Sequence, residues 1–344
     1  MPNLLGTKLP IIQAPMAGVQ DSRLTAAVSN AGGLGSLPCA MLTADALRAE
    51  LEALKANTDQ PFNLNFFAHT PPEPDDVQEQ AWRAALAPYY QELGVDQSVI
   101  ASGPGRQPFN AEMAAMVEEF QPAVVSFHFG LPAPALLQRV KAAGATVLSS
   151  ATTVEEALWL ERNGADAIIA QGFEAGGHRG IFLTRDMTTQ MGTFALLPQV
   201  VAAVGVPVIA AGGIADARGI SAVLSLGASA VQVGTAFMLC PEATTRAVHR
   251  EALKSEASRH TAITNLFSGG PARGIVNRIM RELGPMSATA PAFPLATNAI
   301  APLRAAAEAE FSADFSPLWC GQNAAGCREV SAAKLVQDLA GGGC

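Results

Sequence analysis

Short apolar segments recur along the chain, and each is followed by a longer stretch in which apolar residues repeat with helical spacing. Strands buried on both faces of a parallel sheet read as near-continuous apolar runs. Their regular alternation with helices, without a change in composition, favours a closed α/β TIM (β/α)8 barrel. An open, doubly wound sheet is the alternative, because periodicity does not register closure. The eight predicted strands cover residues 11–13, 33–37, 62–66, 123–127, 146–149, 167–170, 206–210 and 230–233.

The residues after the eighth predicted strand break this alternation. Residues 242–301 lack the strand–helix rhythm, and we predict that they form a mostly helical insertion, a lid over the barrel mouth. The barrel is then assigned to residues 1–241 together with a closing tail, residues 302–344. A length of 344 residues suits one barrel with additions of this kind.

The composition argues against several classes of protein. The chain is 49% hydrophobic and 15% charged, which indicates a large buried core rather than disorder. Its formal charge of −8, without a basic stripe, argues against nucleic acid as a partner. Because no apolar run is long enough to span a bilayer and no secretory signal is evident, we expect a cytoplasmic protein with no membrane partner. The oligomeric state stays open, with a homodimer as one alternative.

The cysteines and histidines give no sign of a metal site. Five cysteines are scattered along the chain and never form a Cys-x-x-Cys pair. This pattern favours a reduced, cytoplasmic protein over a disulfide framework or a zinc site. His128 and His178 also lack partners at metal-ligand spacing, so no metal is predicted.

The segment richest in chemical groups follows the sixth predicted strand and reads Gln171-Gly-Phe-Glu-Ala-Gly-Gly-His-Arg-Gly180. Its glycines allow backbone N–H groups to approach a ligand closely. Active sites of barrels form at the carboxyl ends of the strands, so we predict that His178 transfers a proton there. Glu174 and Arg179 are expected to form a local ion pair that shapes the loop. His128, which ends the fourth strand, is either a substrate contact or a core histidine with internal partners.

Two glycine-containing loops follow the seventh and eighth predicted strands. Gly212 and Gly213 precede a helix that begins near Asp216, and Gly234 and Thr235 open another. Free N–H groups at the start of a helix attract anions, and the loops after strands seven and eight are a recurrent phosphate site in barrels. We therefore predict a phosphate-containing ligand here. The alternative is a pair of tight turns with no ligand.

These residues resemble the nitronate monooxygenase family, formerly called 2-nitropropane dioxygenase, in its bacterial and fungal nitronate-oxidising class. Five motifs in the same order carry the resemblance, which resumes in the C-terminal part of the chain. The motifs are Ile12-Gln-Ala-Pro-Met16, Ser126-Phe-His-Phe-Gly130, Gln171-Gly-Phe-Glu-Ala-Gly-Gly-His178, Ala210-Ala-Gly-Gly-Ile214 and Gln232-Val-Gly-Thr235, then Ala292-Phe-Pro294, Asn298 and Trp319-Cys-Gly-Gln322.

The resemblance implies a TIM barrel that binds FMN non-covalently. His178 would be the base that removes the α-proton of a neutral nitroalkane, and His128 would donate a hydrogen bond in the substrate pocket. Phe293 would lie in that pocket, at a place where relatives carry tyrosine. The two tyrosines of this chain, Tyr89 and Tyr90, fall instead on a predicted outer helix. The cofactor would be bound by Ala14, Pro15, Met16, Asn65, Gln171, Gly176, Gly177, Gly212, Gly213, Gln232, Gly234, Thr235 and Gln322.

The activity that the resemblance implies is oxidation of alkyl nitronates such as propionate 3-nitronate. O2 would be consumed and a carbonyl compound and nitrite released, a detoxification in which the flavin supplies the redox chemistry. The first alternative is an FMN-dependent NAD(P)H:quinone or enoyl reductase on the same barrel. The second is a barrel that binds a phosphate ligand without catalysis.

Overall fold

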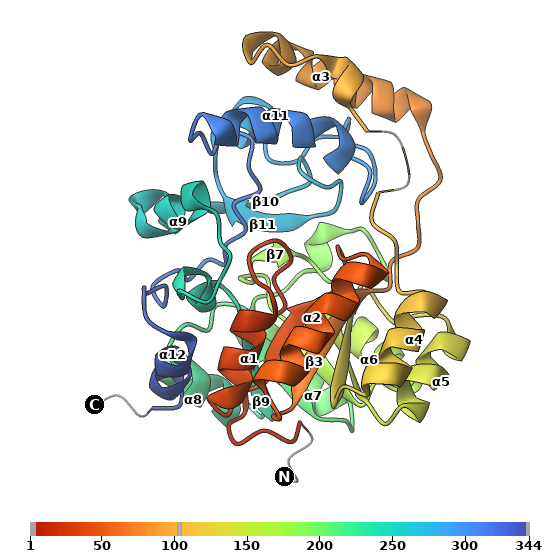
Figure 1. Cartoon of the computed structure of the whole chain (residues 1–344), viewed down its shortest axis with the longest axis vertical. Helices are drawn as coiled ribbons and strands as arrows, with labels where there is room; N and C mark the ends of the chain where they lie inside the picture. The colour runs from red at the N-terminus through yellow and green to blue at the C-terminus, as the bar shows by residue number, and fades with distance from the viewer. Residues whose placement is uncertain (1–4, 102, 104, 342–344) are drawn as a thin grey trace.

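The fold is built on a barrel of eight parallel strands (Figure 1). The computed structural model describes residues 5–101, 103 and 105–341. The strands pair in the order β1-β9-β8-β6-β5-β4-β3-β2, and a parallel bridge from Ile12 to Leu34 connects the two ends of this series. The predicted TIM barrel is therefore confirmed over the open sheet. The barrel strands are β1 (Ile11–Gln13), β2 (Gly35–Pro38), β3 (Phe62–Phe67), β4 (Val124–His128), β5 (Thr146–Ala151), β6 (Ala167–Gln171), β8 (Val208–Ala211) and β9 (Ala230–Val233).

Successive residues of these strands face opposite sides of the barrel wall. Ile169 of β6 packs inside the barrel with Leu148 and Ile12, whereas its neighbour Ile168 packs outward in a cluster that includes Leu196. Both faces of the strand are thus buried, which explains why it reads as a continuous apolar run in the sequence.

Helices cover the outside of the barrel and begin where the sequence predicts. The side chains of Asp21, Thr43 and Thr153 each accept a hydrogen bond from the first turn of the following helix, as N-cap residues do. The barrel helices are α1 (Ser22–Asn30), α2 (Ala44–Asn57), α4 (Ala111–Phe120), α5 (Pro134–Ala142), α6 (Val154–Arg162), α7 (Thr193–Ala203) and α8 (Ala217–Ser225).

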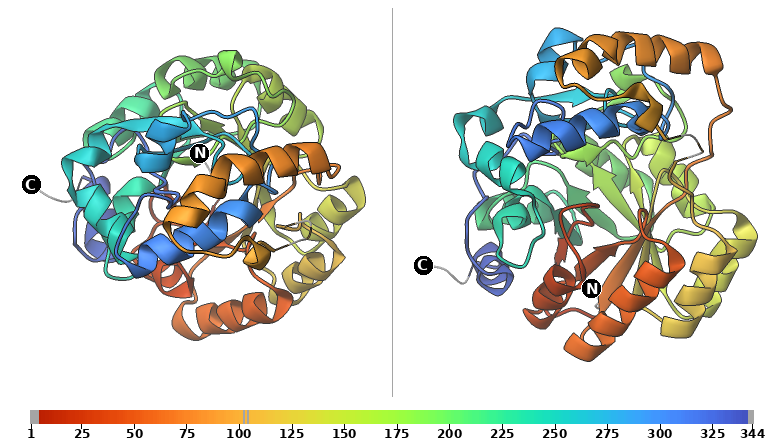
Figure 2. Two further views of the ribbon diagram at one scale, coloured as in Figure 1. Left: turned by 90° about the horizontal axis from the view of Figure 1, so that it is seen from above. Right: turned by 45° about the horizontal axis from the view of Figure 1, so that its top comes forward.

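A second layer, which we call the cap, lies across the mouth of the barrel (Figure 2). The prediction that residues 242–301 are mostly helical is wrong, because only short helices occur there, together with two strands of an antiparallel sheet that the sequence did not predict. In this sheet β10 pairs with β11, and β11 pairs with β7, the short strand that carries His178. The cap consists of α3 (Asp76–Glu92), β7 (Gly177–His178), β10 (Thr261–Thr264), β11 (Ala272–Ile275), α10 (Arg278–Glu282) and α11 (Thr297–Ala309).

The cap also recruits a helix from an early part of the chain. Helix α3 lies in the connection between β3 and β4 and packs against α11. The Trp82 indole N–H donates to the Ala296 carbonyl at 3.2 Å, and the Tyr90 hydroxyl donates to the Ala299 carbonyl at 2.6 Å. Helix α3 lies at the outer edge of the cap (Figure 1), as predicted for the helix of Tyr89 and Tyr90, but the side chains of both tyrosines are buried against the rest of the cap.

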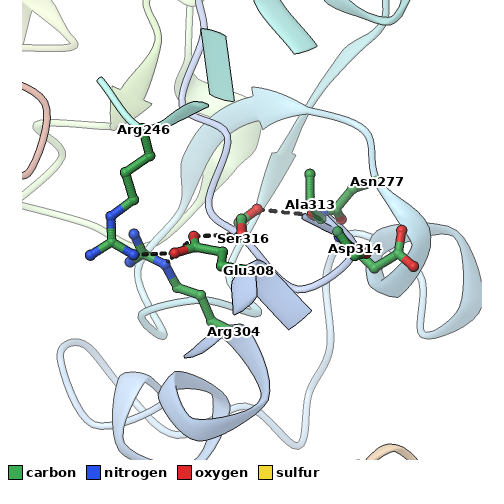
Figure 3. Close-up of polar contacts among 8 residues, drawn as sticks. Arg246, Asn277, Arg304, Glu308, Ala313, Asp314 and Ser316 are labelled. Carbon is green, nitrogen blue, oxygen red and sulfur yellow. Dashed lines mark hydrogen bonds and ion pairs between the residues drawn. The ribbon is translucent and has the colours of Figure 1, made fainter. Parts of the chain in front are cut away.

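A polar cluster ties α11 to the tail that follows it (Figure 3). The Glu308 carboxylate pairs with Arg246 and accepts hydrogen bonds from Arg304 at 2.8 Å and from the Ser316 hydroxyl at 2.7 Å. Asn277 donates to the Ser316 carbonyl at 2.9 Å. Burial by itself would raise the pKa of Glu308, but the hydrogen bonds from Arg304 and Ser316 outweigh it and lower the pKa. The tail is thereby fixed as it returns toward the barrel.

Shorter elements complete the chain. The 3-10 helices η1 (Gln97–Val99), η2 (Met187–Thr189), η3 (Thr235–Leu239) and η4 (Glu256–Arg259) lie in connections, and α9 (Ala247–Lys254) follows the last barrel strand. Helix α12 (Ala332–Leu339) buries Leu335 and Leu339 against the outer barrel core beside α1 and α8. None of the helices in the described part of the chain has the length and apolarity to cross a membrane.

Candidate active site

A cavity lies at the carboxyl ends of the barrel strands, below the cap. It is lined by residues from the ends of β1, β3, β4, β6, β8 and β9 and from the C-terminal tail. His128 and His178 both lie on its wall. Twelve of the thirteen residues predicted to bind the cofactor lie there too, namely Ala14, Pro15, Met16, Asn65, Gln171, Gly176, Gly177, Gly212, Gly213, Gln232, Gly234 and Thr235. The structure thus brings together residues that are spread over more than 200 positions of sequence.

The wall formed by the loops after β8 and β9 is made of backbone. Gly212 and Gly213 have φ angles of 114° and 73°, which residues with side chains rarely adopt. A Cβ atom at Gly234 would lie 3.3 Å from the Cβ of Ala14, so this loop has little room for a side chain. Within the described residues, the N–H groups of Gly213 and Gly234 have no hydrogen-bond acceptor. These open donors suit an anionic oxygen.

The C-terminal tail closes over this glycine wall. The Gly321 N–H donates to the Thr235 hydroxyl at 3.0 Å, and the Asn323 side chain donates to the Gly213 carbonyl at 3.0 Å. Gly321 and Asn323 line the cavity, whereas the Gln322 side chain is exposed and does not. The predicted contact of Gln322 with the cofactor is therefore not supported, because successive residues of this extended tail face opposite ways.

Two carboxamides lie deeper in the cavity. The side-chain oxygen of Gln232 is buried without a hydrogen-bond partner within the described residues. Asn65 uses its side-chain N–H group on the Ser126 hydroxyl, at 2.9 Å. Buried polar atoms normally have partners, so the unpaired Gln232 oxygen indicates a ligand with an N–H or O–H group.

The loop after β6 is held by internal hydrogen bonds. The Gln171 side chain donates to the His178 carbonyl at 2.9 Å and accepts from the Gly180 N–H at 2.8 Å. Arg179 is fully buried and donates to the carbonyls of Gly172 and Gln171 at 2.6 and 2.7 Å. Burial first, and then the charge of Arg273, lower the pKa of Arg179 to about 9.

The ion pair predicted between Glu174 and Arg179 is absent. The Glu174 carboxylate accepts instead from the Thr193 N–H and hydroxyl, at 2.8 and 2.9 Å. Arg179 satisfies itself on backbone carbonyls and on Gln190. Both residues still shape the loop, through separate partners.

His178 lies where the cap meets the barrel. Its ring lies between Phe293 and Trp319, with centroid distances of 5.2 and 5.5 Å. Its Nε2 is 2.7 Å from the Ser268 hydroxyl, and its Nδ1 has no partner within the described residues. Burial first, and then the charge of Arg106, hold the pKa of His178 well below its usual value. The imidazole is therefore neutral at physiological pH, and one ring nitrogen carries a lone pair.

His128 has partners on both ring nitrogens. Its Nε2 lies 3.1 Å from the His178 carbonyl, which can only accept, so Nε2 carries the proton. Nδ1 then accepts from the Ser150 hydroxyl, 3.0 Å away. Burial lowers the pKa of His128 to about 4. The ring lines the cavity but has no free N–H, so in this arrangement it supports the His178 strand and is not the predicted donor to substrate.

Phe293 packs behind the cavity rather than on its wall. Its ring contacts His178 at a centroid distance of 5.2 Å, and His69 and Phe129 at 5.0 Å each. The Arg106 guanidinium carbon lies 5.7 Å from the centroid of the same ring. Phe293 is thus placed to support His178 and Arg106, and any effect on substrate would act through them.

Comparison with known proteins identifies the family. The sequence matches the nitronate monooxygenase family over residues 1–342. The chain belongs to this family. It is 45% identical to a nitronate monooxygenase of Pseudomonas aeruginosa, over 98% of this chain and 96% of that protein. It is also 45% identical to one of Paraburkholderia phytofirmans, over 98% and 92%.

Solved structures agree with this assignment. A nitroalkane oxidase from Streptomyces ansochromogenes superposes with a TM-score of 0.90 at 40% identity, covering 98% of this chain and 96% of that one. FabK from Thermotoga maritima follows with a TM-score of 0.72 at 28% identity, covering 98% and 93%. The protein is thus an enzyme of the nitronate monooxygenase family, whose members oxidise nitronates or nitroalkanes and are in general flavin-dependent.

Two residues that line the cavity, and one that contacts His178 behind it, were not predicted from sequence. Ser268 lies in the Ser268-Gly-Gly-Pro271 turn, a glycine-rich signal inside the segment that was assigned only as a lid. Trp319 appeared in a C-terminal motif but was given no role. Arg106 gave no signal, because one cation in a polar, glycine-containing loop reads as a surface residue. The structure brings Arg106 and Trp319 to the cavity and Ser268 to His178.

Proposed function

We propose that this enzyme uses FMN to oxidise alkyl nitronates, such as propionate 3-nitronate, with O2 to a carbonyl compound and nitrite. One observation carries the proposal: open backbone donors and a neutral histidine face the same cavity. The glycine loops after β8 and β9 suit a phosphate, and His178 lines the same cavity beside the cap. No metal-binding group of acidic, cysteine and histidine side chains occurs in the described residues.

The residues present fit FMN. The N–H groups of Gly213 and Gly234 would bind the phosphate, with the Thr235 loop closed by the tail. The unpaired side-chain oxygen of Gln232 would accept from the cofactor, and Ala14 and Met16 offer an apolar surface for a flat ring. When bound, the flavin would supply the electron-transfer chemistry that no side chain can.

The protein's own contribution to the reaction is to exclude water and to hold one proton acceptor. If the His178 Nε2–H donates to the Ser268 hydroxyl, that hydroxyl can donate to the Gly270 carbonyl at 3.4 Å. Nδ1 then has a free lone pair and would take the α-proton of a neutral nitroalkane. A nitronate has already lost this proton, so its oxidation does not need the base.

The decisive experiment begins with the visible spectrum of the purified protein. We expect bound FMN, O2 consumption on adding propionate 3-nitronate, and one nitrite released for each carbonyl compound formed. A protein that takes up no flavin would refute the proposal. Anaerobic bleaching of the flavin by NADH, without nitronate turnover, would instead indicate the quinone or enoyl reductase. Flavin or phosphate binding with no turnover of either substrate would indicate the non-catalytic barrel.

We further infer a cytoplasmic location. Cys39, Cys240, Cys320 and Cys327 are all free thiols, which supports a reducing compartment. Light scattering of the flavin-loaded protein would distinguish a monomer from a homodimer.

A further inference from the structure

One cation at the cavity has no counter-ion. Arg106 lines the cavity from the connection between β3 and β4. In the described part of the chain its guanidinium forms neither a hydrogen bond nor an ion pair, and its closest described interaction is with the Phe293 ring, 5.7 Å away. Burial first, and then the charge of Arg304, lower its pKa, yet an arginine stays charged at any physiological pH. A partly buried charge of this kind is costly unless an anion binds it.

The cavity offers no anion of its own. Among its described lining residues there is no aspartate or glutamate, and its two histidines are neutral at pH 7. Arg106 also borders an outer hollow that Asp45 and Glu112 share, but neither forms an ion pair with it. The guanidinium is therefore available to a negatively charged group that enters the cavity.

This group is not the phosphate of the cofactor. The Arg106 carbonyl lies 3.2 Å from Nε2 of His69, which follows β3, so Arg106 is held near the end of that strand. Around the ring of eight strands, β3 lies three or four places from β9 and β8. The anion that Arg106 would bind is therefore separate from the predicted cofactor phosphate.

The side of Arg106 is also the side of the proton acceptor. The Phe293 ring contacts both, at 5.2 Å from the His178 ring and 5.7 Å from the Arg106 guanidinium carbon. A short substrate can therefore present its reacting carbon to His178 and the flavin while its far end meets the guanidinium. Arginine is suited to this task, because its planar fork binds a carboxylate through two parallel hydrogen bonds.

We propose that Arg106 binds a carboxylate at the far end of the substrate and so makes the enzyme selective for nitronates that carry a second negative charge. This inference rests on the proposed nitronate oxidation. Arg106 is then a specificity-determining residue, separate from the residues that hold the cofactor.

The test compares two nitronates that differ in one charge: propionate 3-nitronate and the nitronate of 3-nitropropionamide, which has the same shape but a neutral end. In Arg106→Met we expect kcat/KM for the carboxylate to fall about 100-fold, the value of a charged hydrogen bond, and kcat/KM for the amide to change less than about threefold. Arg106→Lys should recover part of the loss, since it restores the charge without the fork. Arg218→Met, at a 94% exposed side chain, is the matched control and should leave both substrates unaffected.

A binding measurement separates this inference from the proposed function. Succinate is a dianion of similar length, and calorimetry on the flavin-loaded protein would give its dissociation constant without turnover. We expect Arg106→Met to raise that constant roughly 10- to 100-fold. Equal losses for both nitronates, or unchanged succinate binding, would overturn the role of Arg106. If the wild type oxidises no nitronate but Arg106 still governs succinate binding, the proposed reaction fails and the anion site stands.

Discussion

The two sides of the cavity are built by different means. One side consists of backbone from the two loops that directly follow β8 and β9. The opposite side consists of side chains whose positions depend on the cap, because His178 lies in the cap sheet and its neighbours Ser268 and Trp319 come from far along the chain. The first side needs only local turns. The second needs a complete tertiary structure, and it is where we expect substrate selectivity to reside.

The largest expected effect falls on the side-chain wall. His178→Ala should reduce kcat/KM for a neutral nitroalkane by about 1,000-fold, a usual loss for a general base, while oxidation of the preformed nitronate falls less than about tenfold. Steady-state O2 consumption with nitroethane and ethyl nitronate would measure both. His260→Ala, at an exposed histidine, is the control. Equal losses on the two substrates would show that His178 shapes the site without acting as base.

The role of the glycine loops in binding the cofactor can be tested by adding a side chain there. Gly234→Val would place a side chain against Ala14 and Met16, so we expect FMN affinity to fall roughly 100-fold, with the fold retained. The flavin-to-protein ratio after dialysis and a circular dichroism spectrum would report on each. Gly219→Ala, where a Cβ meets only ordinary contacts, should keep its flavin. Normal flavin content in Gly234→Val would place the phosphate elsewhere.

A smaller change tests how the cap positions the base. Ser268→Ala removes the hydrogen-bond partner that the His178 ring has among the described residues, so we expect kcat/KM for a nitroalkane to fall about tenfold, the value of one neutral hydrogen bond. The acidic limb of the pH profile of kcat/KM for the nitroalkane should shift, while kcat/KM for the nitronate is unchanged. Ser268→Thr, which keeps the hydroxyl, should recover most of the rate. A loss shared by both substrates, with no shift of the limb, would contradict a positioning role.

The last expected effect is on stability and not on catalysis. Burial lowers the pKa of both His128 and His249 to about 4. The unfolded chain takes up protons on these residues below about pH 6.5, whereas the folded chain does not until about pH 4. The free energy of unfolding should therefore fall with decreasing pH in this window, by about 1.4 kcal/mol per pH unit for each histidine. Urea titrations at pH 7 and pH 5 would measure the slope, and His249→Gln should make it shallower. A slope that the substitution leaves unchanged would count against this origin.

The contrast between the two walls also separates what could be predicted. The sequence placed Gly212, Gly213, Gly234 and Thr235 at the cavity because they stand directly after a strand, and their binding of a phosphate stays a prediction. The roles of His128 and Gln322 were not found from the sequence, because each depends on which way a side chain points. A carbonyl and a serine from other segments occupy both nitrogens of His128, and the tail directs Gln322 to solvent.

Closure of the strands into a barrel is seen only in the tertiary structure. The sequence by itself determined the alternation of strands and helices, the N-cap residues of the helices and the glycine loops after β8 and β9. These features follow from local periodicity and local backbone conformation, which neighbouring residues decide. The tertiary structure decided what the cap contains, with α3 recruited across some 200 residues to α11 and β7 paired with β11. It alone brought Arg106, His178 and Phe293 together. Such contacts between distant segments depend on packing and burial in the whole molecule, and no local pattern records them.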